Sequence, residues 1–559
     1  MSAPAIRTGA RILVDQLKIH GADTVFCVPG ESYLAVLDAL YDANSIRTLT
    51  CRQEGGAAMM AEAHAKLTGK PAILMVTRGP GATNASAGLH VAMQDSTPLI
   101  LMIGQVERAA LDREAFQEID YRRMFGQLAK WVTQIDDPRR IPELISRAYY
   151  VATSGRPGPV VLALPEDMLT EEAAVADAEP WRRVETAPGA AQIAEVMGEL
   201  RRAERPFLLL GGSQWDQEAV HAIERFAAAN SLPVGCVFRR QDRFDNQHPC
   251  YVGDVGIGIN PKLGQRIRAA DLLIVLGSRL GEIATGGYSL IGIPVPRQRL
   301  VHVHADAEEL GRVYQPKVAV NATPRAMARA LAAEAPIANP RWREATAAAR
   351  AEYEAWQQPV RSPGKVQMAE IVRWLGQNMP AETAFTNGAG NFATWLHRFH
   401  RYRGFGTQLA PTSGSMGYGF PAALGAKVQN PARPVVCIAG DGDFQMTGQE
   451  LATAVQYELD VIVLIVNNGM LGTIRMHQER HHPARPFATD LTNPDFAALA
   501  RAYGAFGETV ESTEDFAAAF ARARASGKPA LIDLKIDPEA LTPRQSLSEI
   551  RAEALAAGR

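Results

Sequence analysis

The same alternation of short apolar runs with helical patterns occurs three times along this chain of 559 residues. Because strands that alternate with helices form βαβ units, the pattern predicts an α/β fold of three consecutive doubly wound domains, each built on a parallel sheet. The predicted strands cover residues 24–28, 73–77, 99–103 and 160–164, then 206–210 and 272–276, and finally 435–439 and 461–466. A helix is predicted over residues 57–67, ending before Gly69.

Two stretches, residues 176–191 and 336–365, lose the strand pattern and gain proline and charge, as linkers do. They divide the chain into predicted domains at 1–175, 190–335 and 365–540, followed by a C-terminal tail at 541–559. A chain of this length is too long for a single hydrophobic core, so three domains also agree with its size.

Composition excludes several classes of protein. Charged residues make up 21% and the net charge is −2, so the chain has no general attraction for nucleic acid. Residues 1–7 lack a continuous apolar stretch, and runs such as 461–466 are far too short to cross a bilayer, so we expect a cytoplasmic protein without membrane contact. The five cysteines show no Cys-x-x-Cys spacing, so we expect them to be packing residues.

The third segment carries the most informative residues. The predicted strand at 435–439 runs into Gly440-Asp441-Gly442-Asp443, a helix is predicted over 447–457, and the next strand ends in Asn467-Asn468-Gly469-Met470. Since ligands bind beyond the carboxyl ends of the strands in open α/β sheets, Asp441 and Asn468 should lie close together at that edge.

A carboxylate, an amide oxygen and a backbone carbonyl, completed by oxygens of a bound diphosphate, form the oxygen octahedron that Mg²⁺ prefers. We therefore predict Asp441, Asn468 and the carbonyl of Met470 as metal ligands. The glycines beside Asp441 let backbone N–H groups approach phosphates. The alternative is that Gly-Asp-Gly is an ordinary turn and Asn-Asn a solvated strand end.

With 24 residues between Gly442 and Asn467, this element resembles the fingerprint of thiamine-diphosphate-dependent enzymes. The likeness to acetolactate synthase large subunits covers nearly the whole chain and includes residues 70–84, 94–98, 115–118 and 154–160. The resemblance implies a pyrimidine-binding domain, a central domain and a diphosphate-binding domain, with thiamine diphosphate and Mg²⁺ as cofactors.

The resemblance also implies the cofactor contacts. Glu54, after the apolar run that ends near Cys51, would activate the pyrimidine ring of the cofactor, and Met416 would support its bent shape. The structural alternatives are an acid in the first turn of a helix and a core methionine. The full set of implied cofactor contacts is Glu54, Gly390, Asn391, Gly414, Ser415, Met416, Asp441, Gly442, Asp443, Asn468, Met470, Leu471 and Gly472.

The implied reaction is that of a carboligase, which decarboxylates a 2-oxo acid such as pyruvate and adds the enamine to a second carbonyl. Glu54, Gln117, Glu31 and Gly30 are the catalytic candidates, and Phe116, Ile474 and His477 the candidates for the substrate pocket. Pyruvate decarboxylases typically carry a His-His pair in the first domain and a Glu at the place of Ile474, and this chain has neither.

Several residues depart from the acetolactate synthase pattern. Glu31 replaces a small residue, His477 a pocket tryptophan, and Phe392 a histidine that binds the diphosphate, while Gly-Asp-Gly-Asp replaces Gly-Asp-Ala-Ser. Glu31 is either a proton donor or a helix N-terminal acid. Residues 276–286 resemble the flavin-contacting stretch only in part, so FAD, another adenine nucleotide and an empty central site all stay open.

Two other functions also stay open. One is a thiamine-diphosphate-dependent lyase or decarboxylase acting on a larger 2-hydroxy-ketone, 2-oxo acid or 2-hydroxyacyl-CoA. The other is a catalytically silent nucleotide-binding homologue. The resemblance implies small-molecule 2-oxo acid or aldehyde substrates. Because members of this family build each active site across a subunit interface, it also implies a homodimer at minimum and a homotetramer as the expected assembly. The sequence does not specify a regulatory subunit.

Overall fold

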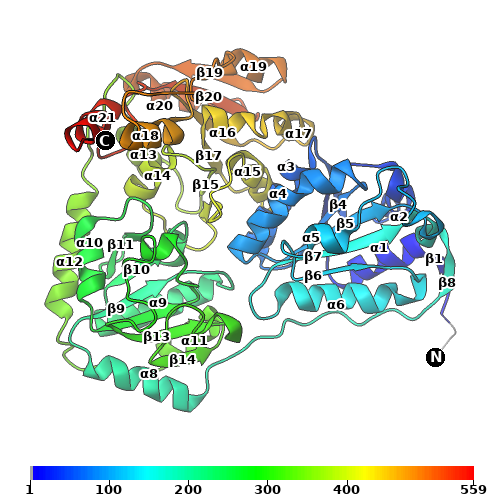
Figure 1. Cartoon of the computed structure of the whole chain (residues 1–559), viewed down its shortest axis with the longest axis horizontal. Coiled ribbons are helices and arrows are strands. Elements are labelled where there is room, and N and C mark those ends of the chain that lie inside the picture. The colour runs from blue at the N-terminus through cyan, green and yellow to red at the C-terminus, as the bar shows by residue number, and fades with distance from the viewer. Residues whose placement is uncertain (1–3, 559) are drawn as a thin grey trace. The chain divides into compact units, whose positions relative to one another are not determined.

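The computed structural model describes residues 4–558 and contains three six-stranded parallel sheets, which confirms the predicted fold class (Figure 1). Residues 1–3 of the predicted first domain and residue 559 of the predicted tail lie outside the described part. Within it, no helix has the length and apolar character needed to cross a membrane. All five cysteines are buried, and none of them forms a disulfide bond.

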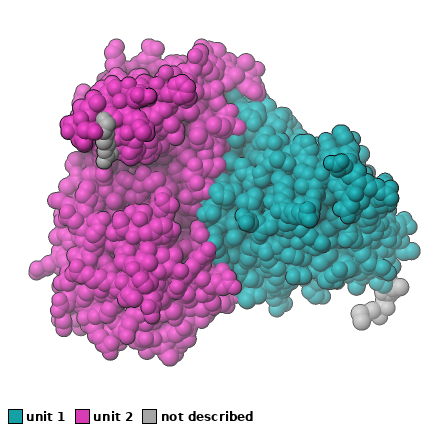
Figure 2. Space-filling model, in the orientation of Figure 1, with its two compact units in different colours: residues 1–184, 420–431, 447–459 teal, residues 185–419, 432–446, 460–559 magenta. Residues whose placement is uncertain are grey.

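The chain forms two compact units (Figure 2). Unit 1 contains residues 1–184 together with 420–431 and 447–459. Unit 2 contains residues 185–419, 432–446 and 460–559. Two short segments of the C-terminal third of the sequence therefore pack with the N-terminal sheet.

The sheet of unit 1 has the strand order β3-β2-β4-β5-β7-β6. Its central strands β4 and β5 are fully buried and apolar except for Gln105 at the end of β5, as expected for a parallel sheet covered on both faces. The long helices α3 (Glu54–Thr68) and α4 (Pro80–Asp95) pack against each other beside it. The strands are β2 (Thr24–Cys27), β3 (Arg47–Thr50), β4 (Ala72–Val76), β5 (Leu99–Gln105), β6 (Trp131–Gln134) and β7 (Pro159–Pro165).

The first sheet of unit 2 has the order β11-β10-β9-β12-β13-β14. The sequence prediction of a linker over 336–365 was wrong in one respect, because α12 (Arg343–Trp356) forms inside it. This stretch is rich in Ala, Glu and Arg, which favour helix, and Tyr353 and the preceding Trp342 are buried in the central core. The strands are β9 (Pro206–Leu210), β10 (Val234–Val237), β11 (Tyr251–Val255), β12 (Leu272–Leu276), β13 (Arg299–His304) and β14 (Val318–Asn321).

The second sheet of unit 2 has the order β16-β15-β17-β18-β20-β19. The helix predicted over 447–457 forms as η7 (Gly448–Glu450) and α17 (Leu451–Gln456). A further short helix, α16 (Asp441–Gln445), which the sequence did not predict, begins at once after β17 and is separated from η7 by Thr447, whose φ is −140°. In the predicted tail, α21 (Leu547–Ala556) packs on α18 (Gly472–His481). The strands are β15 (Ala384–Asn387), β16 (Gln408–Leu409), β17 (Val435–Gly440), β18 (Ile462–Asn467), β19 (Phe506–Val510) and β20 (Ala530–Lys535).

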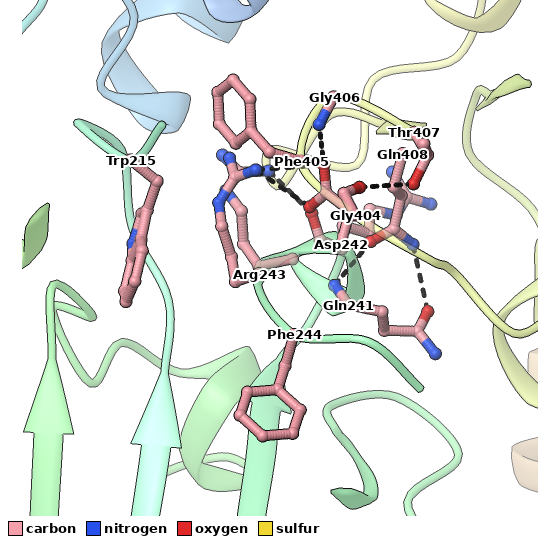
Figure 3. A network of polar contacts seen from close by, with 12 residues as sticks. Trp215, Gln241, Asp242, Arg243, Phe244, Gly404, Phe405, Gly406, Thr407 and Gln408 are labelled. Carbon is pink, nitrogen blue, oxygen red and sulfur yellow. Dashed lines mark hydrogen bonds and ion pairs between the residues drawn. The ribbon is translucent and has the colours of Figure 1, made fainter. Parts of the chain in front are cut away.

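A buried polar network joins the two sheets of unit 2 (Figure 3). Asp242 forms an ion pair of 3.0 Å with Arg243 and accepts a hydrogen bond of 2.9 Å from the backbone N–H of Gly406. The Arg243 guanidinium lies 4.8 Å from the ring centroid of Phe405. Burial lowers the pKa of Arg243, although the neighbouring Asp242 acts in the opposite direction. The buried charge of Arg243 is therefore costly and depends on Asp242 as its counter-ion.

We expect Asp242→Ala to destabilise unit 2 by about 3–5 kcal/mol, because it leaves the buried Arg243 charge without its counter-ion. The double variant Asp242→Leu/Arg243→Met removes both charges and should recover most of the loss. Calorimetric unfolding of the full chain measures both changes. Glu508→Ala removes the partner of the exposed Arg522 and serves as control, with a far smaller shift expected. Equal losses in the single and double variants would contradict the argument.

Within unit 1, the segment 447–459 holds the backbone that leads into α3. The carboxylate of Glu450 accepts hydrogen bonds from the backbone N–H groups of Arg52 (3.1 Å) and Gln53 (2.9 Å), and the Tyr457 hydroxyl accepts one of 2.8 Å from Thr50. Glu450 is fully buried, and burial raises its pKa. These contacts fix the chain immediately before Glu54.

Candidate active site

Asp441 and Asn468 follow two hydrogen-bonded neighbours in one sheet. β17 and β18 pair in parallel, with Gly440 opposite Val466, so the residues after both strands emerge at the same sheet edge. Asp441 is the first residue of α16, and Asn468 is the first residue after β18. The structure thus brings together the two side chains that the sequence predicted to converge.

The Asp441 carboxylate is held by three donors. Its Oδ2 accepts hydrogen bonds from the Gly469 N–H (2.8 Å) and from Asn493 Nδ2 (2.7 Å), and its Oδ1 accepts one from the Gly442 N–H (2.9 Å). Burial raises the pKa of Asp441, and these hydrogen bonds oppose the rise. Sequence reasoning missed Asn493, which lies 52 residues away and belongs to no recognisable motif.

A cavity of about 250 Å³ opens beside Asp441 and Asn468. At one side lies the N-terminus of α18, which has no side-chain cap, so its backbone N–H groups suit an anion such as a diphosphate. Ser415 is not among the lining residues; its hydroxyl donates to the Met416 carbonyl at 3.2 Å. The predicted residues that line the cavity are Gly390, Asn391, Gly414, Met416, Asp441, Gly442, Asp443, Asn468, Met470, Leu471, Gly472 and Ile474.

The donors at this cavity fit a hard cation. Residues 4–558 contain no cluster of three or more His, Cys, Asp or Glu side chains arranged for a metal ion. A metal here would therefore use one carboxylate, from Asp441, together with amide and carbonyl oxygens. Such oxygen donors, completed by phosphate oxygens and water, are what Mg²⁺ accepts.

Asp443, in α16, joins two loops that line the cavity. Its Oδ1 accepts hydrogen bonds from the backbone N–H groups of Ala389 (3.0 Å) and Gly417 (2.9 Å). A Cβ at Gly388 would lie 2.0 Å from this oxygen, so only glycine fits there. Burial raises the pKa of Asp443 to about 7. Asp443 therefore positions the loops that carry Gly390 and Met416.

Glu54 is the first residue of α3 and is 8% exposed. Its Oε2 accepts a hydrogen bond of 2.9 Å from Asn84 Nδ2. A Cβ at Gly81 would lie 3.2 Å from Oε1, so a larger residue there would crowd that oxygen. Asn84 was quoted in the motif at 70–84 but was given no role in the sequence prediction, because only the packing of α3 on α4 brings it to Glu54.

The remaining catalytic candidates lie around the turn that follows β4. Gly30 approaches Thr77 so closely that a Cβ would be 2.4 Å from the threonine Cβ. The exposed Glu31 lies 3.8 Å from Arg78 Nη2, and Arg78 Nε donates to the Phe116 carbonyl at 3.1 Å. Phe116 is 71% exposed, so its ring lines no closed pocket within unit 1.

Gln117 has a φ of +67°, and its backbone lies against Gly79, where a Cβ would be 2.8 Å from the Gln117 carbonyl oxygen. The ion-pairing Arg78 was not predicted from the sequence. In unit 2, the two other pocket candidates lie in α18: Ile474 lines the 250 Å³ cavity, whereas His477 lines a second, larger cavity.

Three family models match this chain. They are the N-terminal TPP binding domain of thiamine pyrophosphate enzymes over residues 7–124, the central domain over 193–331 and the C-terminal TPP binding domain over 388–534. Together they span more than half of the 559 residues. The chain belongs to the thiamine pyrophosphate enzyme family. The recognition made from the Gly-Asp-Gly and Asn-Asn spacing is thereby confirmed.

Curated members of the thiamine pyrophosphate enzyme family match over almost the full length. The acetolactate synthase isozyme 2 large subunit of Escherichia coli is 33% identical, covering 95% of each chain. The acetolactate synthase large subunit of Parasynechococcus marenigrum is 32% identical over 96% of this chain and 88% of its own. The probable large subunit of Methanocaldococcus jannaschii is 30% identical over 96% and 93%.

Proposed function

We propose that this protein is a thiamine-diphosphate- and Mg²⁺-dependent carboligase that acts on 2-oxo acids. In the simplest case, one pyruvate loses its carboxylate as CO₂, and a new bond joins its carbonyl carbon to the carbonyl carbon of a second pyruvate, giving acetolactate. The observation that carries the proposal is the convergence of Asp441 and Asn468 on one cavity with the N-terminus of α18. The full-length similarity to acetolactate synthase large subunits supports the reaction type.

In this proposal Asp441, Asn468 and the Met470 carbonyl hold Mg²⁺, and the backbone of Gly472 and Gly390 faces the diphosphate. Met416 lines the same cavity and supports the cofactor between its two rings. When bound, thiamine diphosphate would supply the electron-accepting thiazolium ring that lets a 2-oxo acid lose CO₂.

The protein residues move and hold protons. The Glu54 carboxyl, oriented by Asn84 through Oε2, would share a proton with the pyrimidine ring of the bound cofactor through Oε1. Gln117 offers an amide to the substrate oxygen, and Glu31, exposed beside Arg78, is placed to exchange protons with water. Glu54 and Asp441 belong to different units, which agrees with a homodimer as the smallest active assembly.

The product formed from pyruvate tests the proposal. We expect the protein with thiamine diphosphate and Mg²⁺ to release one CO₂ for every two pyruvates consumed, with acetolactate as product, measured as acetoin after acid decarboxylation. The Glu54→Gln variant is the matched control for catalysis that does not depend on the site. Acetaldehyde without acetolactate would instead indicate a decarboxylase and would overturn the carboligase assignment.

A further inference from the structure

Unit 2 contains a second, larger cavity of about 640 Å³. It adjoins the 250 Å³ cavity beside Asp441, with which it shares five lining residues: Ala389, Gly390, Asn391, Gly414 and Thr473. Its other walls come from the central sheet, from α12 and from the C-terminal segment that precedes α21. A volume of this order accommodates ligands much larger than a three-carbon acid.

Two arginines lie together in the wall of the larger cavity and do not line the smaller one. The guanidinium carbons of Arg398 and Arg544 lie 3.7 Å and 5.1 Å from the ring centroid of Trp356. Arg398 donates to the backbone carbonyls of Trp356 (3.0 Å) and Pro543 (3.1 Å), and Arg544 donates to those of Gly258 and Ile259. Among residues 4–558, neither arginine has a carboxylate within ion-pair distance.

The positive charges of Arg398 and Arg544 lie close enough to repel each other. Burial lowers the pKa of Arg398 to about 10, and the positive charge of Arg544 adds to that effect. Both side chains keep N–H donors that no backbone carbonyl uses, because each guanidinium has five. An anion placed between them would relieve the repulsion and accept these donors.

The rest of the lining does not neutralise the pair. Asp254 is the sole acidic residue of the cavity wall; burial raises its pKa to about 7, and its enclosed Oδ1 has no hydrogen-bond partner in the described part of the chain. Burial lowers the pKa of both His397 and His477, which favours the uncharged form of each ring. The cavity is therefore positively charged at the Trp356 end.

We propose that the larger cavity takes a carbonyl substrate longer than pyruvate whose far end carries an anionic group, bound between Arg398 and Arg544. This inference rests on the proposed carboligase function and names its acceptor. The carbonyl end reaches the shared wall at Gly390 and Gly414, and the anionic end lies beside Trp356. The anion is a carboxylate or a phosphate, since both match the guanidinium geometry.

A comparison of acceptor substrates, with the holoenzyme and with pyruvate as the donor, tests the proposal. Two matched pairs differ chiefly in the distal charge: succinic semialdehyde against butanal, and glyceraldehyde 3-phosphate against glyceraldehyde. We expect kcat/KM for at least one charged acceptor to exceed that of its neutral counterpart about ten- to a hundredfold, the range of a charge-assisted hydrogen bond. The pair with the larger ratio identifies the anion. Equal values within both pairs overturn the inference.

Arg544→Gln should reduce the charged-to-neutral ratio about tenfold or more, and Arg544→Lys should restore part of it. The exposed position of Arg544 makes both variants compatible with folding. Arg522→Gln, which removes an exposed arginine in α20 (Thr513–Ala525), is the matched control and should leave the ratio unchanged. A ratio that is insensitive to Arg544 overturns the assignment.

A binding measurement separates this inference from the proposed function. Calorimetry with glutarate, an unreactive dianion, and with butyrate should show that the holoenzyme binds glutarate more tightly, and that Arg544→Gln removes the difference. Preference for glutarate without any carboligation overturns the proposed function alone. Carboligation of pyruvate without that preference overturns the inference alone. A flavin absorbance that Arg544→Gln abolishes, with acceptor selectivity unchanged, would assign the cavity to a nucleotide and also overturn it.

Discussion

The Glu54→Gln variant is expected to bind thiamine diphosphate with nearly wild-type affinity while exchanging the cofactor C2 proton about 10² to 10⁴ times more slowly. The amide retains the shape of the side chain and can still accept from Asn84, whose hydrogen bond to Glu54 is 2.9 Å long. It cannot share an acidic proton with the pyrimidine ring. Deuterium exchange at C2, followed by NMR after acid quench, measures the rate.

The exposed acid Asp42, which pairs with Arg11 on the surface of unit 1, provides the control through Asp42→Asn. That change should alter neither binding nor exchange. If Glu54→Gln bound the cofactor and exchanged the C2 proton at the wild-type rate, the catalytic role of Glu54 would be disproved. If it failed to bind, Glu54→Asp would show whether the carboxyl or its position matters for binding.

Asp441→Asn should weaken Mg²⁺-dependent cofactor binding by about a hundredfold or more, because it removes the only carboxylate of the proposed ligand set. The replacement is isosteric and can still accept hydrogen bonds from the Gly469 N–H and from Asn493. The folded structure should therefore persist. Calorimetric titration of the apoprotein with thiamine diphosphate, with and without a chelator, measures the effect.

Asn493→Ala should weaken cofactor binding in the same way but to a smaller extent. In the wild type, Asn493 Nδ2 donates to Asp441 at 2.7 Å and to the side-chain oxygen of Asn467 at 3.0 Å. Residues that orient a metal ligand typically affect affinity about 10- to 100-fold, so a loss smaller than that of Asp441→Asn is expected. Cofactor binding by Asp441→Asn that equals the wild type in Mg²⁺ would remove this carboxylate from the metal site.

The sequence predicted those strands that are apolar runs buried on both faces, such as β9 and β12. It did not predict strands of the same sheets that carry polar residues, such as β3, with the sequence RTLT, and β19, with FGETV. The helix α12 was missed because its alanine-rich sequence lies in a stretch with proline and charge on either side. The short helix α16 was also not predicted. Nor does any residue pattern show that the chain passes from unit 2 to unit 1 between α16 and α17.

The candidate site was predictable where function depends on spacing along the chain. Asp441 and Asn468 follow strands that are adjacent in both sequence and space, so a short motif brings them together. Asn84, Asn493 and Arg544 reach their partners only through tertiary packing, at positions that no motif marks. The role of Glu54 stays a prediction that the C2 exchange measurement addresses, and the roles of Gln117 and Met416 stay predictions.

Unit 1 owes part of its packing to residues 420–431 and 447–459, which come late in the chain. At one such contact Gly425 approaches the Met60 carbonyl so closely that a Cβ would lie 2.3 Å from its oxygen. A gene fragment that stops at residue 184 would thus encode an N-terminal sheet whose helix α3 lacks the segments that cover it. The backbone before α3 would also lose its hydrogen bonds to Glu450. Exchanging this region between related enzymes would require transplanting three separate stretches together, so recombination at the apparent linkers should produce insoluble hybrids.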